Sequence, residues 1–153
     1  ALLAEVQALV SPAGAFGAPR RNANGVDIRR VAHVLAVLEK RCHFPLGQHD
    51  VFIHVPGGLK AFEPATDLAM ALAVASSFKD VPVDPDVVCF GEVGLTGEVR
   101  TVSHADRRVM EAARQGFATC LLPPGKLPGG KKQTIKCMPV QNLEQAFEVA
   151  MQK

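Results

Sequence analysis

The hydrophobic positions of the chain show two periodicities, one typical of helices and one typical of strands. Apolar residues at steps of three and four predict a helix that Asp27 caps and that runs to about Cys42. A second helix is expected from Pro64 to about Phe78; it is apolar nearly all round and should lie centrally in the core. Two further helices are expected at His104–Gln115 and Asn142–Met151. The buried stripe of the first helix is predicted to be Ile28, Val31, Leu35 and Leu38.

Short apolar or alternating runs between these helices predict strands. Three glycines in the range Gly91–Val102 predict a turn and a hairpin. The segments Ser11–Asn24 and Pro123–Lys132 have the composition of loops. The resulting order, β-α-β-α-β-β-α-β-β-α, favours a layered α/β or α+β domain. The other predicted strands are Leu2–Val10, Asp50–Val55, Val87–Phe90, Thr119–Leu122 and Thr134–Met138.

Composition narrows the class of protein. A length of 153 residues suits one domain with one core. The longest apolar stretch, Leu68–Phe78, is too short to cross a bilayer, so we expect no membrane association. The net charge of +2 is too mild to indicate nucleic-acid binding by itself, and the absence of Trp and Tyr weakens any base-stacking mechanism. Because the sequence begins with Ala inside a strand-like run, we expect a fragment of a longer protein.

Known catalytic and cofactor motifs are missing from the sequence. There is no P-loop, no G-x-S-x-G elbow and no H-E-x-x-H pair, and the five histidines are scattered. The four cysteines form no C-x-x-C pair, so we expect no metal site and no cofactor in this chain, and interpret the cysteines as small buried side chains in a reducing compartment. They are Cys42, Cys89, Cys120 and Cys137.

Longer strings carry a more specific signal. The segments Glu63–Ala69 (EPATDLA) and Phe90–Arg100 (FGEVGLTGEVR) resemble the C-terminal domain of the bacterial DNA-repair family RadA, also called Sms. The resemblance covers most of the chain up to about Pro123. Shorter strings that fit the same family are Glu5–Ser11, Asn24–Asp27, Ala75–Phe78 and Val83–Asp86.

That RadA domain is itself similar to the proteolytic domain of Lon protease, which implies a two-layer α/β (α+β) fold of the Lon proteolytic, ribosomal S5 domain 2-like type. Lon uses a serine nucleophile in the pattern G-P-S-A-G and a lysine base. Ala65 occupies the serine position here, and ungapped alignment from Gly91 puts Arg108 at the lysine position. Alanine has no nucleophilic oxygen, and arginine stays protonated and is no general base. We therefore expect no catalytic residue and no enzyme activity in this chain.

Two further expectations concern the neighbourhood of these positions. Asp67 stands where Lon-like sequences have glycine, which predicts a structural ion pair between Asp67 and Arg108. Another hydroxyl would rescue catalysis only with a neutral base beside it, and the spacing offers none. The hydroxyls considered are Thr66, Ser76, Ser77 and Ser103.

The resemblance also implies partners and a parent protein. A RadA-type parent adds a zinc module and a RecA-like, DNA-dependent ATPase, both absent here, so ATP, Mg²⁺ and Zn²⁺ are expected only in those domains. It implies a hexameric ring, DNA binding with branch migration in homologous recombination, and a RecA-type recombinase as partner. The expected location is the cytoplasm of a bacterium, or an organelle if the source is eukaryotic.

Basic side chains mark candidate DNA contacts, since phosphate neutralisation needs no sequence-specific motif. The strongest candidates are two arginine pairs that flank the predicted loop, although solvated helix faces carry such residues too. All candidates are Arg20, Arg21, Arg29, Arg30, Arg107, Arg108, Lys131 and Lys132.

Three hypotheses remain at this point. The first is a scaffold and DNA-handling domain of a RadA-like ATPase. The second is an active Lon-type serine peptidase, which Ala65 and Arg108 oppose. The third is a protein- or RNA-interaction module on the same fold, because a fold does not determine function.

Overall fold

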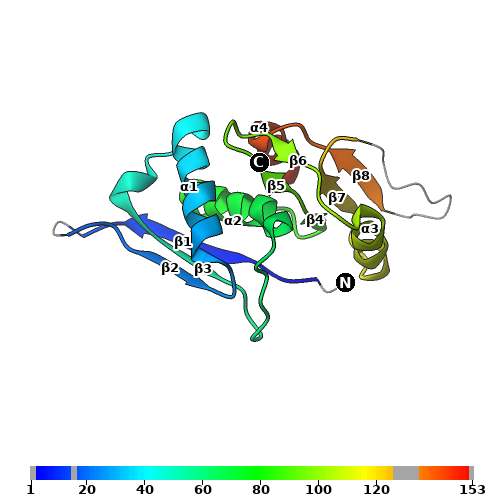
Figure 1. The fold of residues 1–153 in the computed structure, drawn as a ribbon, viewed down its shortest axis with the longest axis horizontal. Helices are drawn as coiled ribbons and strands as arrows, with labels where there is room; N and C mark the ends of the chain where they lie inside the picture. The colour runs from blue at the N-terminus through cyan, green and yellow to red at the C-terminus, as the bar shows by residue number, and fades with distance from the viewer. Residues whose placement is uncertain (1–2, 15–16, 126–134, 152–153) are drawn as a thin grey trace.

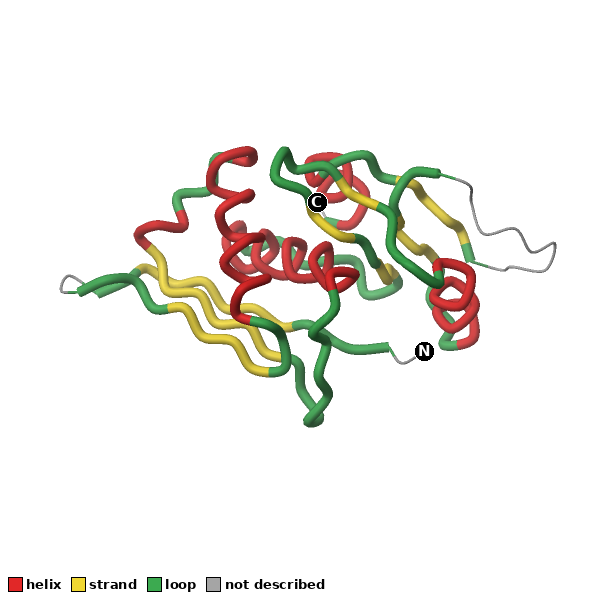
Figure 2. Tube along the Cα trace, in the orientation of Figure 1, coloured by secondary structure: helices red, strands yellow, loops and turns green. Residues whose placement is uncertain are grey.

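The computed structural model describes residues 3–14, 17–125 and 135–151. Its first sheet has the order β1-β3-β2, with β1 (Gln7–Pro12) antiparallel and β2 (Arg21–Asn24) parallel to the central β3 (His49–His54). Helices lie on one face of this sheet, and among the described residues no helix covers the other face (Figures 1 and 2). Val6, Ala8 and Val10 pack against the core, so the alternation in β1 directs its apolar residues toward the helices.

Two helices cover that face. Asp27 caps α1 (Ile28–Cys42) by accepting the backbone N–H of Arg29. A short 3₁₀ turn, Pro64–Thr66, leads into α2 (Asp67–Lys79), which packs against β1, α1 and the fourth helix. Because α2 is apolar nearly all round, it fits only in the centre of the domain, where Figure 1 shows it.

The second sheet is entirely parallel and has the order β4 (Val87–Cys89), β7 (Thr119–Leu122), β8 (Lys136–Pro139). Helix α3 (Ala105–Arg114) covers one of its faces, and α4 (Leu143–Ala150) packs on the other side against α2. A hairpin of β5 (Glu92–Val93) and β6 (Val99–Arg100) follows β4.

The core is divided between two clusters. The larger one surrounds α2 and joins both sheets, while the smaller one lies between α3 and the second sheet. Alternation in β7 separates them, because Cys120 and Leu122 belong to the smaller cluster and Leu121 to the larger one. The smaller cluster consists of Phe90, Val109, Ala112, Cys120, Leu122 and Ile135.

Most predicted elements are confirmed, including all four helices, the hairpin and the strand at Thr119–Leu122. The prediction of a loop over Ser11–Asn24 is wrong, because β1 extends to Pro12 and β2 occupies Arg21–Asn24. The polar sequence of β2, Arg-Asn-Ala-Asn, carries no strand signal and is ordered by pairing with β3. Leu2, Thr134 and most of the predicted loop at Pro123–Lys132 lie outside the described residues.

The buried stripe of α1 also differs from the prediction. Ile28 is exposed, and Val34 and Val37 are buried together with the predicted Val31, Leu35 and Leu38. The contact surface of α1 is wider than one stripe because the helix packs on both α2 and the hairpin. No helix in the described part of the chain is long and apolar enough to cross a membrane.

Candidate functional site

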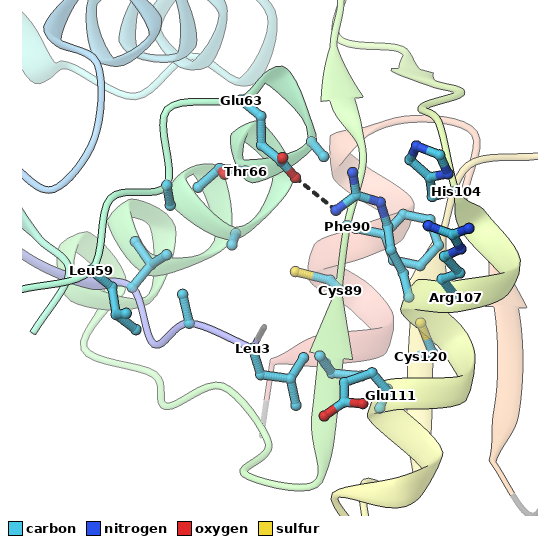
Figure 3. Close-up of a pocket in the computed structure, with 18 of the residues that line it drawn as sticks. Leu3, Leu59, Glu63, Thr66, Cys89, Phe90, His104, Arg107, Glu111 and Cys120 are labelled. Carbon is cyan, nitrogen blue, oxygen red and sulfur yellow. Dashed lines mark hydrogen bonds and ion pairs between the residues drawn. The ribbon is translucent and has the colours of Figure 1, made fainter. Parts of the chain in front are cut away.

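A cleft of about 430 Å³ opens between the end of β4, helix α3, the loop before α2 and the N-terminal residues (Figure 3). It lies where the two apolar clusters meet, so most of its floor is apolar. Polar and charged side chains also line the cleft: Lys60, Glu63, Thr66, His104, Arg107, Arg108 and Glu111. The apolar lining consists of Leu3, Ala4, Val6, Leu59, Ala61, Ala65, Ala69, Val88, Cys89, Phe90, Ala112 and Cys120.

The two positions that the Lon resemblance singles out both line this cleft. Ala65 is buried in the 3₁₀ turn at the start of α2, and Arg108 lies on α3. Elements that are distant in sequence are therefore combined at one site. The side chain at position 65 is a methyl group, which has neither lone pair nor acidic proton.

Arg108 is held in place by three groups. Its Nη1 donates to the carboxylate of Glu63 at 2.7 Å, and its Nε donates to the carbonyl of Ser103 at 2.9 Å. The guanidinium carbon lies 5.8 Å from the centre of the Phe90 ring, within cation–π range. The ion pair with Glu63, dashed in Figure 3, therefore spans the cleft between α3 and the loop before α2.

The predicted ion pair between Asp67 and Arg108 is wrong. The Asp67 carboxylate is 0% exposed and accepts hydrogen bonds from Nε and Nη2 of Arg30 and from the backbone N–H of Val93, the last at 3.0 Å. It therefore faces α1 and the hairpin and does not line the cleft. The pairing raises the pKa of the Arg30 guanidinium, mainly through the hydrogen bond to Asp67.

Thiols on the cleft floor are poorly suited to catalysis. Burial raises the pKa of Cys89 to about 12, and burial with nearby Cys137 and Cys89 raises the pKa of Cys120 to about 12. Since the thiolate is the reactive form, both cysteines remain protonated at neutral pH.

The hydroxyl groups considered as replacement nucleophiles lie in different places. Ser76 Oγ donates to the carbonyl of Val81, and Ser77 Oγ accepts the backbone N–H of Val10, so both take part in structural contacts on α2. Thr66 lines the cleft, and its backbone N–H donates to the carbonyl of Glu63 at 3.1 Å. Among the described residues, no group of three or more His, Cys, Asp or Glu is arranged to hold a metal ion.

The first arginine pair is split by the structure. Arg20 is 71% exposed; its side chain pairs with Asp50 at 3.3 Å and lies over the Phe52 ring. The backbone N–H of Arg20 also donates to Asp50, which holds the pKa of that carboxyl below its usual value. Arg21 points the other way and donates to the carbonyls of His49 and Leu46.

The second pair is split in the same manner. Arg29 is 88% exposed beside the capping residue Asp27, whereas Arg30 is tied to Asp67. All four arginines bond to the protein itself, but the side chains of Arg20 and Arg29 remain mostly exposed, whereas those of Arg21 and Arg30 are 28% and 26% exposed. Contact of these arginines with DNA stays a prediction. Arg20 directly precedes β2, and Arg29 lies in the first turn of α1, which follows β2.

The remaining candidates stand as follows. Arg107 is exposed at the rim of the cleft, and Arg108 is half-buried within it. Lys131 and Lys132 lie outside the described residues. Glu63 and Arg30 were not predicted as the partners of Arg108 and Asp67. Helical periodicity was a usable signal for Arg30, since it lies one turn before the buried Val34 on α1.

The chain is similar to known proteins over nearly its whole length. A family model described as the Lon protease (S16) C-terminal proteolytic domain matches residues 26–153. The DNA repair protein RadA of Synechocystis sp. is 46% identical over 150 residues, which cover 98% of this chain and 29% of that protein. RadA of Bacillus subtilis is 46% identical over 151 residues, covering 98% and 33%, respectively. RadA of Mycolicibacterium smegmatis is 44% identical over 133 residues, covering 86% and 28%. The chain thus spans about a third of the length of the curated relatives it matches.

Proposed function

The chain belongs to the family of Lon protease C-terminal domains, in the group of the bacterial DNA repair proteins RadA, and we propose that it is a scaffold and DNA-binding domain without peptidase activity. One observation carries the proposal: at the site that Lon uses for catalysis, Ala65 lies in one cleft with an Arg108 neutralised by Glu63. A protonated, paired guanidinium beside a methyl group supplies neither base nor nucleophile.

The wider proposal follows from the relatives. The chain is the Lon-like part of a longer RadA-type protein whose zinc module and RecA-like ATPase, with Zn²⁺, ATP and Mg²⁺, lie outside it. It assembles as a hexameric ring that keeps the ATPase domains in register during branch migration and cooperates with a RecA-type recombinase in the bacterial cytoplasm. The mass of the assembly in solution, measured with and without duplex DNA, gives the number of copies in the ring.

DNA binding is proposed to use the two exposed arginines that flank β2. Replacing Arg20 and Arg29 together with glutamate is expected to weaken duplex binding at least about ten-fold and to lower the salt slope by about 2, since each lost phosphate contact removes about one released counterion. Fluorescence anisotropy with a labelled duplex, at several salt concentrations, measures both quantities.

The control for this variant has the same change in charge at another place. Lys40 and Lys136 are exposed on α1 and β8, and both are replaced with glutamate. The control is expected to retain most of the affinity. If both double variants lose affinity equally, the surface defined by Arg20 and Arg29 is refuted, and net charge alone explains the binding.

Absence of peptidase activity has its own test. A fluorophosphonate probe, which labels activated serine and threonine hydroxyls, is expected to leave the chain unlabelled, because Ala65 at the position of the Lon serine has no hydroxyl. An active Lon-type peptidase serves as the positive control. Labelling that disappears on replacing Thr66 with alanine would show that a rescued nucleophile exists and would restore the peptidase hypothesis.

A further inference from the structure

The cleft has the size and lining of a ligand site. Its volume of about 430 Å³ lies within the ~300–1,000 Å³ typical of cavities that hold small ligands. Figure 3 shows Leu3 and Leu59 toward one end, Glu63 and His104 toward the other, and Cys89 between them, with the Glu111 side chain next to Leu3. A ligand with an apolar body and one polar end matches a lining that is mainly apolar, because covering apolar surface removes it from water.

The polar end is prepared for an anion. Arg108 is 21% exposed and fixed by Ser103 and Phe90, so its guanidinium keeps its position without Glu63. Glu63 is 54% exposed, and its side chain makes no other hydrogen bond or ion pair with the residues that the structure describes, so it can swing into solvent. The ion pair therefore has one rigid cationic half and one movable anionic half.

Charge balance indicates which anion fits. The basic residues Lys60, Arg107 and Arg108 outnumber the acids Glu63 and Glu111 by one. The cleft thus complements a single negative charge, whereas a doubly charged phosphate would also face the two acids. A planar carboxylate matches the fork of a guanidinium in two parallel hydrogen bonds.

We propose that the cleft binds the carboxyl-terminal end of a partner protein, with one or two apolar side chains on its floor and the terminal carboxylate on Arg108 in place of Glu63. The cleft is too small for a long segment, so the end of a chain fits better than its interior. This function is non-catalytic and independent of DNA binding.

The test compares two forms of one peptide. Fluorescein-labelled Ala-Leu-Ala-Leu-Leu is prepared with a free C-terminal carboxylate and with a C-terminal amide, and the anisotropy of each is titrated with the 153-residue chain. The acid form is expected to bind on the order of ten-fold more tightly, since a charge-assisted hydrogen bond is lost in the amide.

Variants assign this preference to the ion pair. Replacing Glu63 with glutamine is expected to tighten binding of the acid form roughly three- to ten-fold and to leave the amide form unchanged, because Arg108 no longer has an internal competitor. Replacing Arg108 with glutamine should abolish the preference. Lys40→Gln on α1 removes one positive charge away from the cleft and is expected to behave like the wild type.

Several outcomes overturn the proposal. They are equal binding of acid and amide by the wild type, no binding of either peptide up to millimolar concentration, and a Glu63→Gln variant that binds the acid no better. If Arg108→Gln does not fold, Glu63→Gln decides alone, because Glu63 is exposed and its loss leaves the core unchanged. DNA affinity, measured in parallel, shows whether this outcome is separate from that of the DNA-binding proposal.

Discussion

Replacing Arg30 with glutamine is expected to lower the free energy of unfolding by about 3–5 kcal/mol, because it leaves the Asp67 carboxylate buried without its cation. Within the described part of the chain, the backbone N–H of Val93 is the only donor to that carboxylate besides Arg30. A single remaining donor compensates poorly for removing a charge from water. Equilibrium unfolding in urea, followed by circular dichroism, measures the loss.

A double-mutant cycle separates the pair from its surroundings. Replacing Asp67 with asparagine in the Arg30→Gln background removes the stranded charge, so the double variant should be more stable than the sum of the two single losses predicts. Arg29→Gln is the neighbouring control, since Arg29 is almost fully exposed, and its unfolding midpoint should stay close to that of the wild type. Additive losses in the cycle would mean that Arg30 and Asp67 stabilise the domain independently.

Periodicity was a sufficient guide to the elements that carry their own signal. The four helices and the strand at Thr119–Leu122 follow from apolar spacing, and Asp27 caps α1 as predicted. Asn142 caps α4 in the same manner, which the structure adds. Periodicity did not predict the strand β2. Its four residues, three of them polar, form a strand only because the neighbouring β3 offers a free edge, which is a tertiary effect.

The candidate site was predicted in its location but not in its pairing. Family resemblance identified Ala65 and Arg108, and the structure brings both into one cleft. The partner of each charge depends on which side chains cross between elements. Arg30 reaches Asp67 from α1, and Glu63 reaches Arg108 from a loop, over 37 and 45 residues, respectively. Spacing along α1 indicates that Arg30 lies on the buried side of the helix, but it does not identify the partner on another element.

The split of the arginine pairs has a simple local cause. Neighbouring residues in extended backbone point to opposite faces, so Arg20 lies over Phe52 on the open face of the sheet while Arg21 turns toward the helices. On α1, a step of one residue is about 100°, which moves the side chain from the solvent at Arg29 to the contact with α2 at Arg30. A run of two basic residues therefore indicates one exposed charge more reliably than two.

Replacing Gly25 with alanine is expected to lower the free energy of unfolding by about 2–5 kcal/mol, because it combines backbone strain with overpacking. Its φ of +84° costs a residue with a side chain about 1–2 kcal/mol. A Cβ there would also lie 2.8 Å from Cβ of Val55 and 2.9 Å from the carbonyl oxygen of Leu59, and such overpacking costs about 1–3 kcal/mol more. Urea unfolding of the variant and the wild type measures the sum.

Gly116→Ala isolates the backbone strain, because Gly116 has a φ of +90° and no atom within 4 Å of the place that a Cβ would take. Its loss should therefore be about 1–2 kcal/mol, and equal losses in both variants would show that the loop at Leu59 yields without cost. The difference also bears on the cleft. The carbonyl of Gly25 accepts the N–H of Ala61 at 2.7 Å, and Leu59 and Ala61 line one wall. A side chain at position 25 pushes on that wall, so Gly25→Ala should weaken peptide binding even under conditions in which the variant is fully folded.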